Sequence, residues 1–305
     1  MTDIRIESAL ELAIDAHNDM GESPLWSARE QALYWIDVNL DPRILRWDAR
    51  TGEARTWPMP ERVGGLVLKA DGGAMVTLAS GIFEFDFATG ELSAFAPSPL
   101  PPHVAMHECL CDRDGRFWVG AINTRARDYP DPPCGAKLYR MEGDRLIEQV
   151  DGITCANGLA FSPDGTRLYL TDSRTRRVEC WTVDRATGDL SDRRLFAEIE
   201  EGAGFVDGAT VDAHGNYWAA MVFGAALRCY RPDGSLALDY KLPFDNPTKM
   251  AFGGPDLSTL YITTTRLAPR AGALGPGAGM LGGVYTLGVS VPGIEDTMFP
   301  AFKSR

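Results

Sequence analysis

The sequence predicts an all-β fold, a six-bladed β-propeller with four-stranded antiparallel blades. Three observations favour it. A turn-and-strand pattern recurs six times along the chain, each copy is followed by hairpin signals, and no long helical periodicity appears. Repeats of about 40–50 residues built from short strands are typical of propeller blades.

Each repeat is a polar turn followed by a short apolar or aromatic strand. Matched strand positions are separated by 40, 43, 51, 49 and 43 residues, which is the spacing of blades. The copies are REQALYWID (29–37), ADGGAMVTL (70–78), RDGRFWVGA (113–121), PDGTRLYLTD (163–172), AHGNYWAAM (213–221) and PDLSTLYITT (255–264).

A second strand pair follows each copy, closed by another polar turn. In 44–57 and 81–95, alternating apolar and polar residues flank a Thr-Gly pair, which predicts hairpins. Each unit therefore supplies about four strands. The sixth unit is incomplete, and ALELAID (9–15) is predicted to supply its missing strand and close the ring. Closure removes free sheet edges. We expect a single propeller domain over residues 1–305.

Two other architectures compete for this pattern. A generic all-β protein also has frequent turns, but six copies in register with one period rarely arise by chance. A WD40 propeller requires Trp-Asp and Gly-His pairs in its units, whereas the Trp-Asp at 47–48 stands alone.

Charge and the N-terminal segment restrict the partners. The net charge of −12 repels phosphate backbones, so a nucleic-acid partner is not expected. This charge suits a metal cation or a neutral substrate. Residues 1–17 lack the basic start and apolar run of a secretory signal, and no apolar stretch is long enough to span a bilayer. We expect a cytoplasmic protein without a membrane partner, as a monomer or small homo-oligomer.

The cysteine and histidine content argues against a zinc site built on soft ligands. None of the six cysteines forms a Cys-x-x-Cys pair, and the chain has four histidines. We expect reduced thiols packed as small apolar residues.

In a propeller the innermost strand of each blade lines the central channel, and we expect the residues just before it to form a rim on one face. These positions lie ten to twelve residues ahead of the matched strand positions. They are Glu22, Gly64 and Gly65, His107 and Glu108, Asn157, Asp207, and Thr248 and Lys249.

Three of the rim residues, Glu22, Asn157 and Asp207, offer hard oxygen ligands. Two carboxylates and an amide carbonyl suit one divalent cation, completed by water or substrate. Two carboxylates near an axis would be costly without such a counter-charge. The alternative is that each residue caps a turn, since Glu-Ser-Pro, Asn-Gly and Asp-Gly are good turn material. Their common level in three repeats favours the metal site.

His107, Glu108 and Lys249 share this level. A histidine there could donate, accept or bind metal near neutral pH, or be a hydrogen-bonded structural residue. A solvated surface lysine is the common outcome for Lys249.

At these residues the sequence resembles the family of gluconolactonase, regucalcin and luciferin-regenerating enzyme, over nearly the whole chain from about Glu11. The resemblance implies a six-bladed propeller with one divalent metal on Glu22, Asn157 and Asp207. It also implies lactone hydrolysis, with Asp207 as the general base. The motifs that carry it are GESPLW (21–26), YWID (34–37), DRDGRFWVGAI (112–122), ANGLAFSPDGTRLYLTDS (156–173), VDGATVDAHGNYWAA (206–220) and PTKMAFGGPDLSTLYITT (247–264).

One segment departs from the family pattern. Many sugar-lactonase members carry Arg-x-Asn-Asp-Gly before the third blade's inner strand, where the Arg and Asn contact substrate. Here Ala105, His107 and Glu108 stand at the Arg, Asn and Asp positions. We therefore expect these three residues to lie at the substrate, with a changed pattern of polar contacts.

The expected reaction is hydrolysis of a sugar (aldono-) lactone to its hydroxy acid. The metal would act as Lewis acid and Asp207 as base, and Ca²⁺, Zn²⁺, Mg²⁺, Mn²⁺ and Fe²⁺ all tolerate such ligands. Two alternatives remain open. One is hydrolysis of a non-sugar lactone or a related ester such as a phosphotriester on the same metal site, and the other is a calcium-binding propeller without catalysis.

Overall fold

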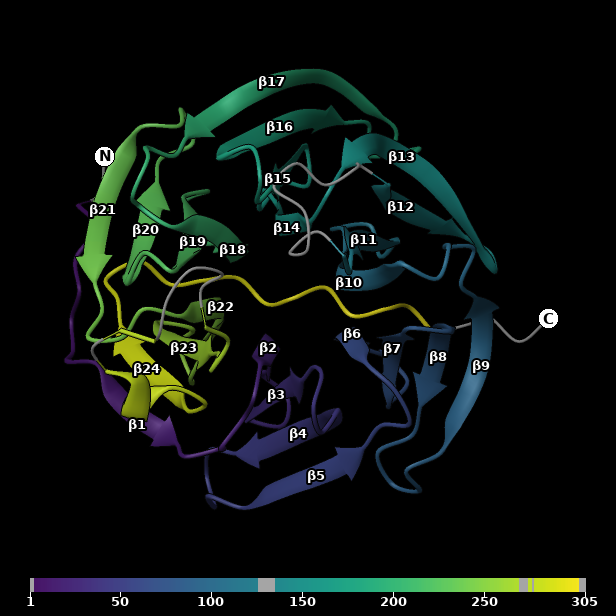
Figure 1. Ribbon diagram of the computed structural model, residues 1–305, viewed down its shortest axis with the longest axis horizontal. Coiled ribbons are helices and arrows are strands. Elements are labelled where there is room, and N and C mark those ends of the chain that lie inside the picture. Colours follow the sequence, from purple (N-terminus) through teal and green to yellow (C-terminus); the bar gives the residue numbers. More distant parts are fainter. Residues whose placement is uncertain (1–2, 126–134, 269–273, 276, 302–305) are drawn as a thin grey trace.

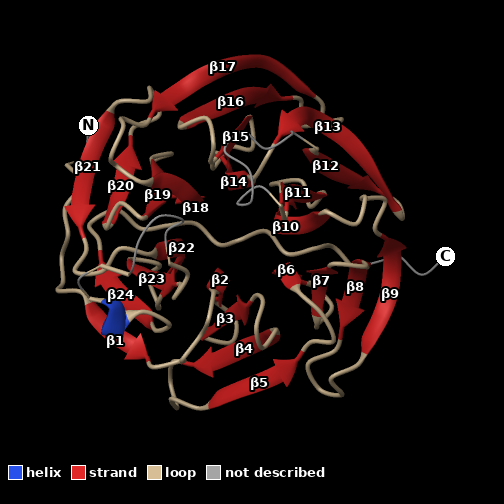
Figure 2. Cartoon of the chain, in the orientation of Figure 1, coloured by secondary structure: helices blue, strands red, loops and turns tan. Residues whose placement is uncertain are grey.

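The computed structural model describes residues 3–125, 135–268, 274–275 and 277–301. Its strands form six four-stranded antiparallel sheets arranged around a central channel (Figure 1). The short 3₁₀ turn η1 (Ala278–Met280) is the one helical element of this described part, and strands and loops make up the rest (Figure 2). No helix within these ranges is long and apolar enough to cross a membrane. The predicted six-bladed propeller is confirmed.

The strands of each blade follow one another from the channel outwards. Blade 1 is β2 (Gly21–Ser27), β3 (Ala32–Asp37), β4 (Arg43–Asp48) and β5 (Ala54–Pro58); blade 2 is β6 (Val63–Leu68), β7 (Ala74–Leu78), β8 (Gly81–Phe85) and β9 (Leu92–Pro97); blade 3 is β10 (Val104–Cys111), β11 (Phe117–Asn123), β12 (Ala136–Glu142) and β13 (Arg145–Ile153). Blade 4 is β14 (Ala156–Phe161), β15 (Arg167–Asp172), β16 (Arg177–Val183) and β17 (Leu190–Glu198); blade 5 is β18 (Phe205–Val211), β19 (Tyr217–Val222), β20 (Ala226–Tyr230) and β21 (Leu236–Lys241); blade 6 is β22 (Pro247–Gly253), β23 (Thr259–Thr264), β24 (Val284–Gly288) and β1 (Glu11–Ile14).

The ring closes as predicted. β1 lies at the outer edge of blade 6 and pairs antiparallel with β24, where Leu12 faces Tyr285. A strand from the beginning of the chain thus completes the last blade, and this sheet has the same four strands as the other five.

The repeated strand of each unit is the second strand of its blade, not the innermost one. Its apolar residues are buried between blades, because both faces of a blade are covered by its neighbours. In β11 the Trp118 side chain is fully buried and its indole N–H donates to Asp112 Oδ2 at 3.1 Å. In β19 the equivalent Trp218 donates to Asp212 Oδ2 at 2.9 Å. These bonds satisfy the indoles inside the apolar layers.

The predicted rim residues lie within the innermost strands rather than ahead of them. Our expectation of their place was wrong by one strand, because the recurring motif marks the second strand. All six innermost strands have an irregular register at this level. The breaks fall at Glu22/Leu25, Val63/Gly65, Met106/Cys109, Asn157/Ala160, Val206/Ala209 and Pro247/Met250. Bulges of this kind bend a strand and redirect its side chains.

The opposite end of the channel is crossed by the C-terminal segment 289–301 (Figure 1). The segment forms bridges with the ends of two inner strands on opposite sides of the ring, Gly293 to Asp212 after β18 and Phe299 to Lys69 after β6. Phe299 is buried, and its N–H donates to Leu68 O at 2.8 Å. We call the end that carries the bulges the mouth and the end crossed by this segment the floor.

Candidate functional site at the channel mouth

The mouth brings together the three predicted metal ligands. Glu22 (β2) and Asn157 (β14) are buried, and Asp207 (β18) is partly exposed to the channel. Removal from bulk water raises the pKa of Asp207 well above its usual value, and the Glu22 and Glu108 carboxylates raise it further. Burial likewise raises the pKa of Glu22 to about 7, against the opposing effect of Lys249. Burial is the main cause of both shifts, and the Glu22 carboxylate lies close enough to raise the pKa of Asp207.

Neither Glu22 nor Asp207 forms an ion pair within the described residues. Glu22 Oε2 accepts one hydrogen bond, from the Ser23 N–H at 2.8 Å. Two carboxylates in this setting repel each other, and the nearby Lys249 charge offsets the cost of burying them only in part, so a bound cation would relieve the remainder. With the Asn157 carbonyl they form a donor set of hard oxygens, which fits one divalent ion. No group of three or more His, Cys, Asp or Glu side chains in the described ranges could hold a metal ion, so a site at the mouth would depend on two carboxylates and an amide oxygen.

His107 holds the side-chain oxygen of Asn157. The His107 Nε2 and Asn157 Oδ1 atoms are 3.0 Å apart, and His107 Nδ1 lies 3.2 Å from Arg62 Nη2. A guanidinium only donates, so Nδ1 must accept and the imidazole proton lies on Nε2. His107 therefore donates to Asn157 Oδ1, which keeps a second lone pair free. Burial and the nearby Arg62 charge lower the pKa of His107 to about 3, so the ring is neutral at physiological pH.

A buried ion pair lies next to these groups. Lys249 Nζ binds Glu108 Oε1, and Glu108 Oε2 accepts the Leu159 N–H at 2.9 Å. Lys249 is thus paired across the channel rather than solvated, contrary to the common outcome for a lysine. Its aliphatic stem runs beside Gly208, where an added Cβ would lie 2.4 Å from Lys249 Cγ. The Asp-Gly pair at 207–208 therefore supplies a carboxylate at the mouth and the space for this lysine.

The remaining rim positions are structural in this geometry. The Thr248 hydroxyl donates to Gly21 O at 2.6 Å. An added Cβ on Gly64 would lie 2.5 Å from Met106 O, so β6 needs glycine there to approach β10. Ala105 is buried in β10 opposite Ile122 and contributes only a methyl group.

Arg62 is a mouth residue that the sequence analysis missed. It precedes β6, and its Nη1 donates to Met106 O at 2.7 Å. Gly64 and Gly65 occupy the rim level in blade 2, and they have no side chain that could indicate a site there. The available signal was a charged residue directly before an apolar inner strand.

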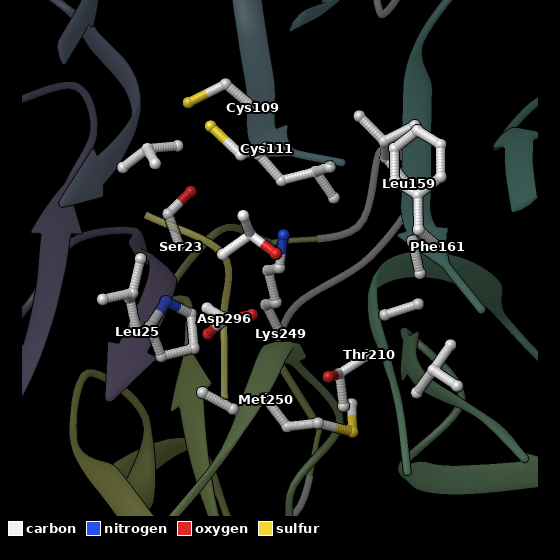
Figure 3. A pocket seen from close by; sticks show the side chains of 18 of the residues that line it. Ser23, Leu25, Cys109, Cys111, Leu159, Phe161, Thr210, Lys249, Met250 and Asp296 are labelled. Carbon is white, nitrogen blue, oxygen red and sulfur yellow. The ribbon is translucent and has the colours of Figure 1, made fainter. Parts of the chain in front are cut away.

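Below the mouth, a cavity of about 60 Å³ is lined by all six inner strands and by Asp296 and Thr297 of the floor segment (Figure 3). This volume holds about four water molecules at most. Cys109 and Cys111 lie at this cavity, and all five cysteines of the described ranges are unpaired thiols. Cys134 lies outside the described residues.

Comparison with known proteins gives a consistent assignment. Residues 20–266 match the model of the SMP-30/gluconolactonase/LRE-like region. The chain is 36% identical over 285 residues to a 6-deoxy-6-sulfogluconolactonase of Pseudomonas putida, covering 92% of this chain and 94% of that protein. It is 31% identical over 255 residues to a pentonolactonase of Haloferax volcanii, covering 82% and 83%.

Among solved structures, the fold is similar to that of a calcium-binding protein, regucalcin, from Agrobacterium tumefaciens. The TM-score is 0.87 at 23% identity, covering 95% of this chain and 97% of that one. The propeller with its mouth of redirected inner-strand residues, together with these matches over most of the sequence, shows that the chain belongs to the SMP-30/gluconolactonase/LRE-like family.

Proposed function

We propose that this protein hydrolyses the lactone of a sugar acid to the open hydroxy acid, at a single divalent metal ion held by Glu22, Asn157 and Asp207. The observation that carries the proposal is the pair of poorly solvated carboxylates, neither in an ion pair within the described residues, beside an amide oxygen that accepts a hydrogen bond from His107. The lactonase names of two relatives support the reaction class.

Asp207 is the proposed general base. When bound, the metal ion would supply Lewis-acid polarisation of the lactone carbonyl and stabilisation of the oxyanion. Asp207 then accepts the proton of the attacking water. Asp207 suits this role because its carboxylate is partly exposed to the channel, whereas Glu22 is buried and accepts the Ser23 N–H.

The neighbouring residues position these groups rather than exchange protons. His107 is neutral and donates to Asn157, which fixes the direction of the amide oxygen. Lys249 is paired with Glu108, so Glu108 is neutralised and does not compete with Asp207 for a cation. We place the enzyme in the cytoplasm, acting on a small-molecule lactone.

The test is proton release from a panel of aldonolactones by metal-free protein and by protein reconstituted separately with Ca²⁺, Zn²⁺, Mg²⁺, Mn²⁺ and Fe²⁺. We expect turnover with at least one metal and its loss on chelation. Isothermal titration of the same ions should show one site per chain, with proton release on binding because Glu22 has a raised pKa. Turnover that persists in metal-free protein would refute the metal-dependent mechanism.

A second candidate function is binding of a cation at the same site without catalysis. The Agrobacterium protein of the same fold is described as calcium-binding, and a hard oxygen set also suits Ca²⁺. Tight Ca²⁺ binding without hydrolysis of any lactone or ester in the panel would favour that reading. Turnover of non-sugar lactones or phosphotriesters alone would keep the metal site and change the substrate class.

A further inference from the structure

Arg62 is a cation at the mouth without a carboxylate partner. Its side chain is partly exposed, and its guanidinium bonds to Met106 O and His107 Nδ1, both uncharged acceptors. It forms no ion pair within the described residues, whereas Lys249 beside it is paired with Glu108. Burial lowers the pKa of Arg62, against the opposing effects of Cys155 and Glu22. A guanidinium keeps its charge in any such setting.

The other charges of the mouth are compensated once the proposed metal is bound. A divalent ion would offset Glu22 and Asp207, Lys249 offsets Glu108, and His107 is neutral because its Nδ1 accepts a hydrogen bond from Arg62. The Arg62 charge then remains. A poorly solvated charge without a partner is costly, and the Arg62 contacts to Met106 and His107 use only two of its five N–H groups.

The guanidinium also stands beside the changed substrate segment. At position 105, β10 has a buried alanine, which offers only a methyl group. Arg62 comes from the neighbouring blade and contacts that segment at Met106 and His107. Its planar fork matches carboxylate and sulfonate oxygens in pairs, which a lysine cannot do.

We propose that Arg62 binds an anionic substituent of the substrate, so that this enzyme selects a sugar lactone bearing a carboxylate or sulfonate away from the reacting carbonyl. This inference rests on the proposed function and differs from the expectation from net charge, which favoured a metal cation or a neutral substrate. The net charge of −12 is a property of the whole chain, whereas a bound substrate interacts with the local charges at the mouth.

The experiment uses matched lactones and variants of the metal-loaded protein. Glucaro-1,4-lactone carries a carboxylate where glucono-1,4-lactone carries a hydroxymethyl group, and 6-deoxy-6-sulfogluconolactone provides the sulfonate. The variants are Arg62→Gln, Arg62→Lys and the control Arg113→Gln. Arg113 is a guanidinium at the floor that also binds a main-chain carbonyl, Glu295 O at 2.9 Å.

We expect wild type to prefer an anionic lactone, and the carboxylate and sulfonate arms identify which anion it takes. Arg62→Gln should lower kcat/KM for that lactone about 10- to 100-fold, mainly through KM, since a charge-assisted hydrogen bond is lost. The neutral lactone should change less than about threefold. Arg62→Lys should fall between, and Arg113→Gln should keep the preference. Calorimetry should show the matching loss of affinity for glucarate and none for gluconate, at unchanged metal content.

Equal losses for charged and neutral lactones, or loss of metal, would show that Arg62 only holds Met106 and His107, and would overturn the inference. So would a wild type without preference for either anion. Failure of the proposed function is distinguishable, because no lactone would then be hydrolysed while glucarate calorimetry would still report whether Arg62 binds an anion.

Discussion

The mouth and the floor of the channel are built from the same six strands, yet they differ in chemistry. At the mouth, broken register turns Asn157, Asp207 and Lys249 toward neighbouring blades and the axis. Toward the floor the pairing is regular, and apolar side chains such as Leu25 and Phe161 line the cavity together with Arg113 and Asp296. The bulge, rather than the choice of strand, therefore separates an end where polar side chains converge from an end with regular strand pairing.

The largest contrast between the two ends should appear on removing one carboxylate from each. Asp207→Asn keeps an oxygen ligand and loses the base, so kcat should fall by about 10²–10⁴ while most metal is retained. Asp296→Asn at the floor cavity is the matched control and should leave kcat within a few-fold. The measurements are steady-state kinetics and metal content. Near-normal kcat in metal-loaded Asp207→Asn would mean that another group, with Glu108 the next candidate, is the base.

A substitution at the floor should change the stability of the protein rather than its catalytic rate. Phe299 is buried and anchors the crossing segment at Leu68. Phe299→Ala should reduce the free energy of unfolding by about 3 kcal/mol, in the range for buried phenylalanines. Urea unfolding of metal-loaded protein measures the loss, and kcat of the folded fraction should stay near wild type. A large drop in kcat at saturating metal would mean that floor and mouth are coupled.

The next difference should be a dependence of stability on pH, which arises from Glu22 at the mouth. The pKa of Glu22 is about 7 in the folded protein and near 4.5 when unfolded, so the folded state binds more protons between these values. The Glu22 shift alone should therefore cost metal-free protein about 3 kcal/mol of stability as pH rises from about 4.5 through 7, and the raised pKa of Asp207 acts in the same direction. Glu22→Gln should flatten this slope, and so should saturating metal. A slope unchanged by Glu22→Gln would assign the effect to other groups.

The smallest expected effect is on stability, when the space around the Lys249 side chain is filled. In Gly208→Ala the new methyl group meets the Lys249 stem, and overpacking of this kind costs about 1–3 kcal/mol. Gly279→Ala is the control, since an added Cβ there meets nothing within 4 Å. Thermal unfolding of both variants checks the difference. Equal stabilities would mean that Lys249 moves aside freely and that its pairing with Glu108 is loose.

The sequence predicted the architecture well because blades repeat. Period, turns and the closing strand at 9–15 are all local patterns, and the structure has them as expected. It also identified the level of Glu22, Asn157 and Asp207, which the structure brings to one space. Their role as metal ligands stays a prediction.

The missed features depend on contacts between blades. The bulges are pairing events between strands, and composition does not encode them directly. The link from Arg62 to His107 joins blades 2 and 3 across 45 residues, and the pairing of Lys249 with Glu108 spans 141. The two residues of each pair lie too far apart in the sequence for a local pattern to connect them. The contacts of Arg62 and Lys249 therefore emerged only from the fold.

The segment that crosses the floor has a consequence for biosynthesis. Phe299 pairs with Leu68 and Lys69, and β24 pairs with β1. The strands that are synthesised first therefore gain these partners only after all six inner strands have been translated. Until then a growing chain is an open arc with bare strand edges, which can recruit other chains. The time between translation of residue 68 and residue 299 is therefore the interval in which this protein most needs protection by chaperones.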